Sequence, residues 1–90
     1  MADTKSKTVN IGSASKTLAQ LLSEAVPDGV IAVTLITPEG SIHYNPRGTA
    51  SQGNSILPPV YTVYERKESM DQIQLYAPED TQVGIIVHED

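Results

Sequence analysis

Two stretches decide the fold that the sequence predicts: VIAVTLITPEGSIHY, residues 30–44, and IQLYAPEDTQVGIIV, residues 73–87. Each contains an apolar run rich in β-branched residues, then a Pro-Glu pair, then a second run with apolar residues at alternate positions. Proline pre-sets the first corner of a turn, and the polar residues after it suit an exposed bend. Both stretches therefore predict β-hairpins that supply most of the core of a small β domain.

Residues 30–37 form the strongest predicted strand, because both of its alternating faces are apolar. One face carries Ile31, Val33 and Leu35, and the other carries Val30, Ala32, Thr34 and Ile36. A strand that is apolar on both faces is expected to be covered on both sides. Residues 60–64 predict a further strand, in which Tyr61 and Tyr64 point to opposite faces.

The remaining segments predict one short helix and several connections. Over residues 16–26, apolar residues recur at three- and four-residue spacing, which predicts an amphipathic helix that ends before Pro27. A serine at the end of residues 12–15 would cap its N-terminus. Residues 1–8 are small and polar and predict a flexible N-terminal arm, while residues 45–55 predict an exposed loop.

The fold class that follows is mainly β: a small β-sandwich or barrel of about six short strands with one short N-terminal helix. It forms a single domain over residues 9–90. A chain of 90 residues has a thin core, and without cysteine neither a disulfide nor a cysteine-ligated metal can reinforce it. Oligomerisation is the remaining common remedy, so we expect a homo-oligomer.

The charge and hydropathy of the chain limit its partners. The net charge is −5 at pH 7, which argues against nucleic acid or an anionic membrane as partner, since both select for clustered lysine and arginine. No apolar run approaches 18 residues, so no transmembrane helix is expected. The first residues lack the apolar core of a secretory signal, so we expect synthesis in the cytoplasm.

The sequence offers no group of residues that predicts catalysis. His43 and His88 are the only histidines, and a metal site needs three or four converging ligands. The serines lie in predicted loops and caps, without the G-x-S-x-G pattern of many serine hydrolases. Glu39 and Glu79, in the two Pro-Glu turns, are expected to be solvated. We therefore expect no enzyme, no metal and no cofactor.

Tyrosine supplies the main hint of an interaction surface. Strand alternation leaves at least one of Tyr61 and Tyr64 partly exposed, and tyrosine is enriched in protein–protein contacts. The alternative is a half-buried tyrosine whose hydroxyl lies in water. An apolar segment just before this strand would extend the surface. The candidate interface residues are Arg47, Ile56, Leu57, Pro58, Tyr61 and Tyr64.

The order of several short motifs carries a family resemblance. These are VNIGSASKTL at residues 9–18, YNP at 44–46, ILP at 56–58, LYA at 75–77 and VGIIV at 83–87. In this order they resemble small decoration or cement-type proteins on the capsids of tailed bacteriophages. In that group a strand carrying Leu-Tyr-Ala and a final Val-x-Ile-x-Val strand close a small β-sandwich. The resemblance spans roughly residues 9–88.

The resemblance implies a non-enzymatic structural protein located in the virion and made in the host cytoplasm. Its partner would be the major capsid protein or another virion protein. Bound copies would staple neighbouring subunits and stabilise the head lattice, with many weak contacts adding up by avidity.

Two other functions fit the sequence less closely. A small acidic binding module could regulate a host or viral protein, although the acidic residues are scattered along the chain and are not expected to line one face. A cupin-like barrel with enzyme or ligand-binding activity would need a cluster of histidines and a carboxylate on facing strands. The two histidines stand far apart in the sequence and do not predict such a cluster.

Overall fold

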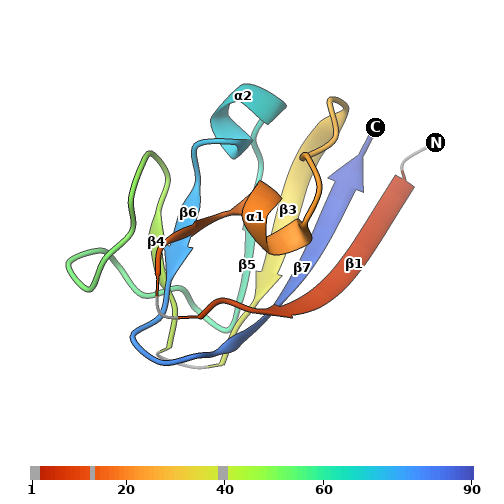
Figure 1. Ribbon diagram of the computed structural model, residues 1–90. Helices are drawn as coiled ribbons and strands as arrows, with labels where there is room; N and C mark the ends of the chain where they lie inside the picture. The colour runs from red at the N-terminus through yellow and green to blue at the C-terminus, as the bar shows by residue number, and fades with distance from the viewer. Residues whose placement is uncertain (1–2, 13, 39–40) are drawn as a thin grey trace.

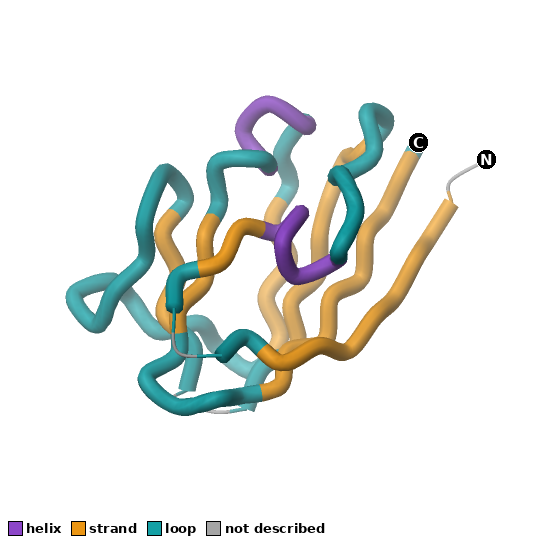
Figure 2. Tube along the Cα trace, in the orientation of Figure 1, coloured by secondary structure: helices purple, strands orange, loops and turns teal. Residues whose placement is uncertain are grey.

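The computed structural model describes residues 3–12, 14–38 and 41–90. Strands dominate these residues, and the two helices are short (Figure 2). The elements in chain order are β1 (Asp3–Asn10), β2 (Lys16–Thr17), α1 (Leu18–Leu22), β3 (Val30–Ile36), β4 (His43–Asn45), β5 (Val60–Val63), α2 (Lys67–Met70), β6 (Gln74–Tyr76) and β7 (Gln82–Glu89).

The strands form two antiparallel sheets. The large sheet has the strand order β1-β7-β3-β5, and the small sheet has the order β2-β6-β4. In Figure 1 the two sheets form separate layers, α1 lies between them in this view, and α2 lies at one end. This arrangement confirms the predicted mainly β fold class, with two short helices in place of one.

One hydrophobic core joins the two sheets and both helices. Its buried side chains include Leu35 and Ile85 from the large sheet, Leu75 from the small sheet, Leu18 from α1 and Met70 from α2. Each of these five side chains is at most 1 % exposed. Apolar burial of this kind is the main favourable term in folding, at about 25 cal/mol per Å².

The two proline-containing turns connect different sheets, so the predicted hairpins are wrong. β3 lies in the large sheet and β4 in the small one, whereas β6 lies in the small sheet and β7 in the large one. β3 pairs with β5 and β7 instead, and β6 pairs with β2 and β4. Alternation identifies the buried side of a strand but not its neighbour, so two runs facing each other across the core give the same pattern as a hairpin.

The N-terminus forms an edge strand where the sequence predicted a flexible arm. β1 pairs with β7 along its whole length, from Asp3 opposite Glu89 to Asn10 opposite Gln82. Lys7 donates a 2.9 Å hydrogen bond from Nζ to the carbonyl oxygen of Leu22, which joins this strand to α1. The strand is mostly polar, so neither its composition nor its alternation distinguished it from an arm. Residues 1–2 of the predicted arm lie outside the described residues.

The helix is shorter than predicted and begins later. Thr17, not a preceding serine, is the N-cap, and it exchanges hydrogen bonds with Gln20 in a capping box. Ser23 takes a left-handed conformation with φ of 60° and ends the helix four residues before Pro27. Ser15 instead donates to the Gln74 side chain at 2.6 Å, while Ser13 lies outside the described residues.

A β-bulge in β3 alters the predicted alternation. The register between β3 and β7 shifts between Val30 and Ala32, so that Val30 is buried and Ile31 is 47 % exposed. Ile36 at the other end of the strand is 45 % exposed. The expected cover on both sides of this strand is therefore only partial among the described residues: on the outer side Ala32 is buried, whereas Ile36 lies at the surface.

Candidate functional site

The large exposed apolar side chains of the described residues lie on β3, on β5 and on the segments that flank β5. They are Ile31 and Ile36 of β3, Val60 and Tyr61 of β5, Ile56 before β5 and Tyr64 after it. β3 and β5 are neighbours in the large sheet, and β5 is its edge strand. Single exposed apolar residues are common, but a contiguous group marks an interaction surface.

Residues 56–64, which we call the edge strip, run from the edge of the small sheet to the edge of the large one. At one end Ile56 forms a bridge with His43, next to β4. The Thr37 amide donates to the carbonyl of Pro59 at 2.8 Å, which fixes the strip beside β3. Ile56, Val60 and Tyr64 are 50 %, 63 % and 78 % exposed, respectively. The strip therefore presents apolar side chains on a backbone that both sheets hold.

The structure separates the candidate interface residues of the sequence into three groups. Ile56, Pro58, Tyr61 and Tyr64 are exposed on the edge strip. Leu57 is only 3 % exposed and packs in the core, so it cannot contact a partner. Arg47 is exposed in the loop after β4, where it lines a separate hollow with Tyr44 and Glu65.

Tyr61 points to the inner side of β5 and packs against Tyr44 of β4. The two rings meet edge to face, with their centroids 5.8 Å apart. Burial, followed by the neighbouring Tyr61 and Glu65, raises the pKa of the Tyr44 hydroxyl above its usual range. This contact joins the edges of the two sheets and holds the middle of the strip in place.

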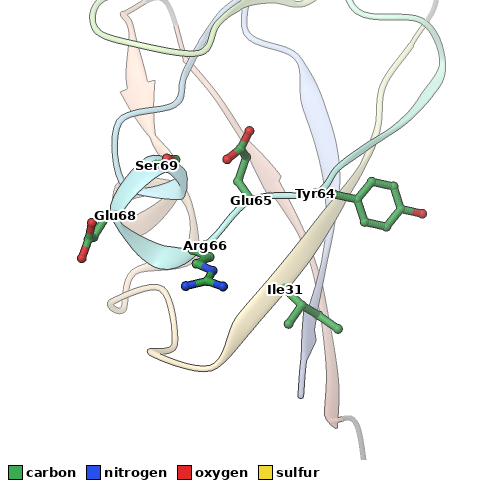
Figure 3. Close-up of a pocket in the computed structure, with 6 residues that line it drawn as sticks. All are labelled: Ile31, Tyr64, Glu65, Arg66, Glu68 and Ser69. Atoms are coloured by element: carbon green, nitrogen blue, oxygen red, sulfur yellow. The ribbon is translucent and has the colours of Figure 1, made fainter.

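Tyr64 borders a shallow hollow between β3 and α2. Figure 3 shows Tyr64 and Ile31 beside β3, with Glu65 and Arg66 on the segment that leads to α2. Glu68 and Ser69 of α2 complete the lining. The hollow combines an aromatic ring, an aliphatic side chain and charges of both signs, which suits the side chains of a protein partner.

The outer face of the large sheet, the side away from the small sheet, carries no formally charged side chain among residues 6–12, 30–36, 60–63 and 82–88. Directly paired residues point to the same side of a sheet, so the register identifies this face. Its residues are Ser6, Thr8, Ala32, Thr34, Ile36, Val60, Thr62, Gln82, Gly84, Ile86 and His88. At its centre the Thr34 hydroxyl bonds Thr62 Oγ1 at 3.0 Å and His88 Nε2 at 3.1 Å.

Charge collects instead at the end of the molecule where α2, the loop after α1 and the C-terminus lie together (Figure 1). We call this the acidic end; its carboxylates are Glu24, Asp28, Glu65, Glu68, Asp71, Glu89 and Asp90. They are seven of the eleven acidic residues in the chain. Lys67 lies among them, 3.2 Å from Asp71 and bonded to the Val26 carbonyl at 2.8 Å. The acids are spread along the sequence but brought together in space.

Sequence reasoning missed the outer face. The signal was present in β3, whose two apolar sides predicted cover on both sides of the strand but did not indicate what covers them. In the structure Val33 and Leu35 point into the core, while Ile36 lies on the outer face. Ile86 and Gly84 of β7 were assigned to the predicted second hairpin and not to a surface.

The described residues contain no helix that is both long enough and apolar enough to cross a membrane. Within the same part of the chain, His, Asp and Glu side chains nowhere form a group of three or more that could hold a metal ion. Comparison with models of protein families, with curated proteins and with solved structures finds no match for this chain.

Proposed function

We propose that this protein is a non-enzymatic structural component of a virus particle, of the capsid decoration or cement type, that binds and stabilises the head lattice. One observation carries the proposal: every large exposed apolar side chain of the described residues lies on β3, on β5 or on the edge strip. A compact β domain with exposed apolar side chains at one edge of a sheet suits attachment to a larger protein surface. The motif order described above points to the same class of protein.

The edge strip suits contact through side chains more than strand addition. β5 has only four residues, and Pro58 and Pro59 directly precede it, so its edge offers little backbone for another strand to pair with. Tyr64 is the most exposed of the strip's apolar side chains. Tyrosine adds contact area at little cost in conformational entropy, so we assign Tyr64 and Ile56 as the two anchors of the lattice contact.

Weak contacts would suffice for this role because they repeat over the shell. A module of 90 residues can contribute only a modest interface, but each bound copy that bridges two capsid subunits engages both at once. The lattice would then resist expansion through the sum of many such bridges.

Co-sedimentation with virus particles from the source lysate, quantified by mass spectrometry, tests this function. We expect the wild-type protein in the particle fraction at many copies per particle. A Tyr64→Ser, Ile56→Ser double variant should lose most of this binding, while Ala25→Ser, at an exposed position after α1, should keep it. Wild-type protein found only in the soluble fraction would refute the proposal.

The acidic end supports a second candidate, a small acidic module that binds and regulates a basic host or viral protein. Its seven carboxylates lie around Arg66 and Lys67, so the end is strongly negative overall. Binding of this kind should weaken steeply between about 50 and 500 mM salt, because exposed charges are screened. Attachment through the edge strip should change little over the same range, so salt dependence distinguishes the two candidates.

A further inference from the structure

We propose that a second copy of this chain docks face to face on the outer face of the large sheet. The two copies are related by a two-fold axis that runs along the strands, between β3 and β7. This inference goes beyond attachment to a lattice and does not depend on it.

The charge distribution favours a second copy as the occupant. Two copies that each carry a net charge of −5 repel one another through most of their surfaces. Of the residues that the structure describes, those on the outer face include no aspartate, glutamate, lysine or arginine. It is therefore a broad surface on which two identical acidic chains can meet with no formal charge inside the contact itself.

The sizes of the side chains make this face complementary to itself. Along the β3–β7 ladder each outward pair joins a larger and a smaller side chain: Ile36 with Gly84, Ile86 with Thr34, and His88 with Ala32. A two-fold axis parallel to the strands places β3 of one copy over β7 of the other, in the same row. Every large side chain then lies opposite a small one, as an isologous interface requires.

Gly84 provides the clearest recess in this pattern. Hollows over its backbone are lined by Thr8, Ile36 and Gly84, together with neighbouring residues of β1 and β7. A Cβ atom at Gly84 would lie only 3.3 Å from Cβ of Ile36 in the same chain. A side chain at this position would be crowded against Ile36 of the same chain, and with glycine the adjoining hollows stay open to Ile36 of the second copy.

The sequence pattern of β3 gives a second reason. A strand with apolar residues on both sides is typical of strands that are covered on both sides. One molecule covers the side of Val33 and Leu35 fully, but on the other side, where Ala32 is buried, it leaves Ile36 45 % exposed. A second sheet packed on Ile36 and Ile86 would cover the other side, with the sheets about 10 Å apart as in ordinary sandwiches.

The area of the face sets the expected strength. Four strands about 4.8 Å apart, with a rise of about 3.3 Å per residue, give roughly 400–500 Å² per copy. The total lies near the lower limit for a specific interface, so we expect a dimer that dissociates at micromolar concentrations.

Single cysteines provide the most direct test, since the chain contains none of its own. Sheet spacings place the two Ile36 Cα atoms about 11 Å apart across the axis. Ile36→Cys should therefore be linked efficiently into a dimer by a short bis-maleimide. Ile56→Cys is similarly exposed but lies next to the small sheet, away from the axis, and should give only background linking. Equal linking of the two variants would overturn the proposal.

Sedimentation velocity between about 1 and 500 μM supplies the second test. Wild-type protein should pass from monomer to dimer, and Ile36→Lys should raise the dissociation constant at least tenfold by opposing two charges across the axis. Ile86→Lys should do the same, and Ile56→Lys should leave the constant unchanged. Monomer throughout the range, or wild-type association of both face variants, would refute the dimer. Particle binding is measured separately, so either proposal can fail alone.

Discussion

The outer face of the large sheet and the acidic end share only strand β7 and differ in almost every surface property. The outer face presents β-branched side chains, a glycine recess and a central network of hydroxyls. The acidic end, where β7 finishes and α2 lies, holds seven of the eleven acidic residues. A small acidic protein can thus keep a net charge that favours solubility while leaving one broad surface open to association.

The comparison also shows how one strand can serve two purposes. Adjacent residues of β3, Leu35 and Ile36, differ completely in exposure, at 0 % and 45 %. Leu35 holds the two sheets together, whereas Ile36 contributes to the surface. If the outer face serves association, its exposed apolar side chains, such as Ile36, should contribute little to the stability of a single molecule.

The largest predicted effect separates these two purposes. Leu35→Ala should lower the free energy of unfolding by about 2–5 kcal/mol, because it opens a cavity in the core. Ile36→Ala should cost about 1 kcal/mol or less in a dilute monomer, mainly through lower strand propensity. Urea unfolding at low micromolar concentration measures both changes.

Ile36 should matter more for association than for the stability of a single molecule. Ile36→Ala should weaken dimerisation more than Val60→Ala, which changes an exposed residue of the same face on the edge strand. A loss of stability from Ile36→Ala as large as that from Leu35→Ala would mean that Ile36 is needed to hold the fold together. The outer face would then not be a surface set aside for association.

Much of the fold could be predicted because burial follows alternation. The strands around residues 30–37, 60–64, 73–77 and 83–87 were predicted from apolar runs and their flanking turn residues, and strands lie in all four places. Strand pairing could not be predicted in this way. Pro38 and Pro78 are compatible with a hairpin turn and equally with a crossover between sheets, and the partners of β3 and β6 lie far away in the sequence.

The surface was harder to predict than the core, for a related reason. Tyr64 and Ile56 were identified because tyrosine and apolar residues near prolines stand out in a sequence. The outer face depends on rows that join β1, β7, β3 and β5, so it emerges only from the register. The acidic end depends on three segments that meet in space. Only the end of β1, at Val9 and Asn10, was interpreted as a possible short strand. The rest of β1 is polar, and its partner β7 lies far away in the sequence.

The network at the centre of the outer face gives the next largest effect. Thr34→Val removes the hydroxyl that bonds both Thr62 and His88, and should cost about 1 kcal/mol of stability even though the shape of the side chain is kept. Thr8→Val, an exposed position on the same face, serves as control and should change stability by less than about 0.5 kcal/mol. Thermal or urea unfolding measures the difference. Equal costs for the two variants would show that the network does not stabilise the sheet.

Added salt should weaken the binding of a basic partner to the acidic end. It should strengthen dimerisation through the outer face, by a smaller factor. Screening reduces the repulsion between two acidic ends, so dimerisation should strengthen by no more than about threefold between 50 and 500 mM salt. Glu68→Gln combined with Glu89→Gln should reproduce part of this gain at low salt. Sedimentation equilibrium measures the constants. Dimerisation that weakens steeply with salt would point to an interface that includes charged pairs, contrary to the docking proposed for the outer face.

The smallest effect concerns Tyr44, which lies between the edge strip and the acidic end. Burial, then the nearby Tyr61 and Glu65, raises the pKa of Tyr44 in the folded state. A raised folded-state pKa means that its contribution to stability is complete below the unfolded tyrosine value near 10 and is lost as the pH rises through the folded-state pKa.

Unfolding measured from pH 8 to 11 should therefore show an alkaline loss of stability that Tyr44→Phe reduces and the exposed-site control Tyr64→Phe retains. Glu65→Gln should reduce the loss by a smaller amount than Tyr44→Phe, because burial is the larger cause. An alkaline loss of stability that Tyr44→Phe leaves unchanged would show that ionisation of the Tyr44 hydroxyl is not its cause.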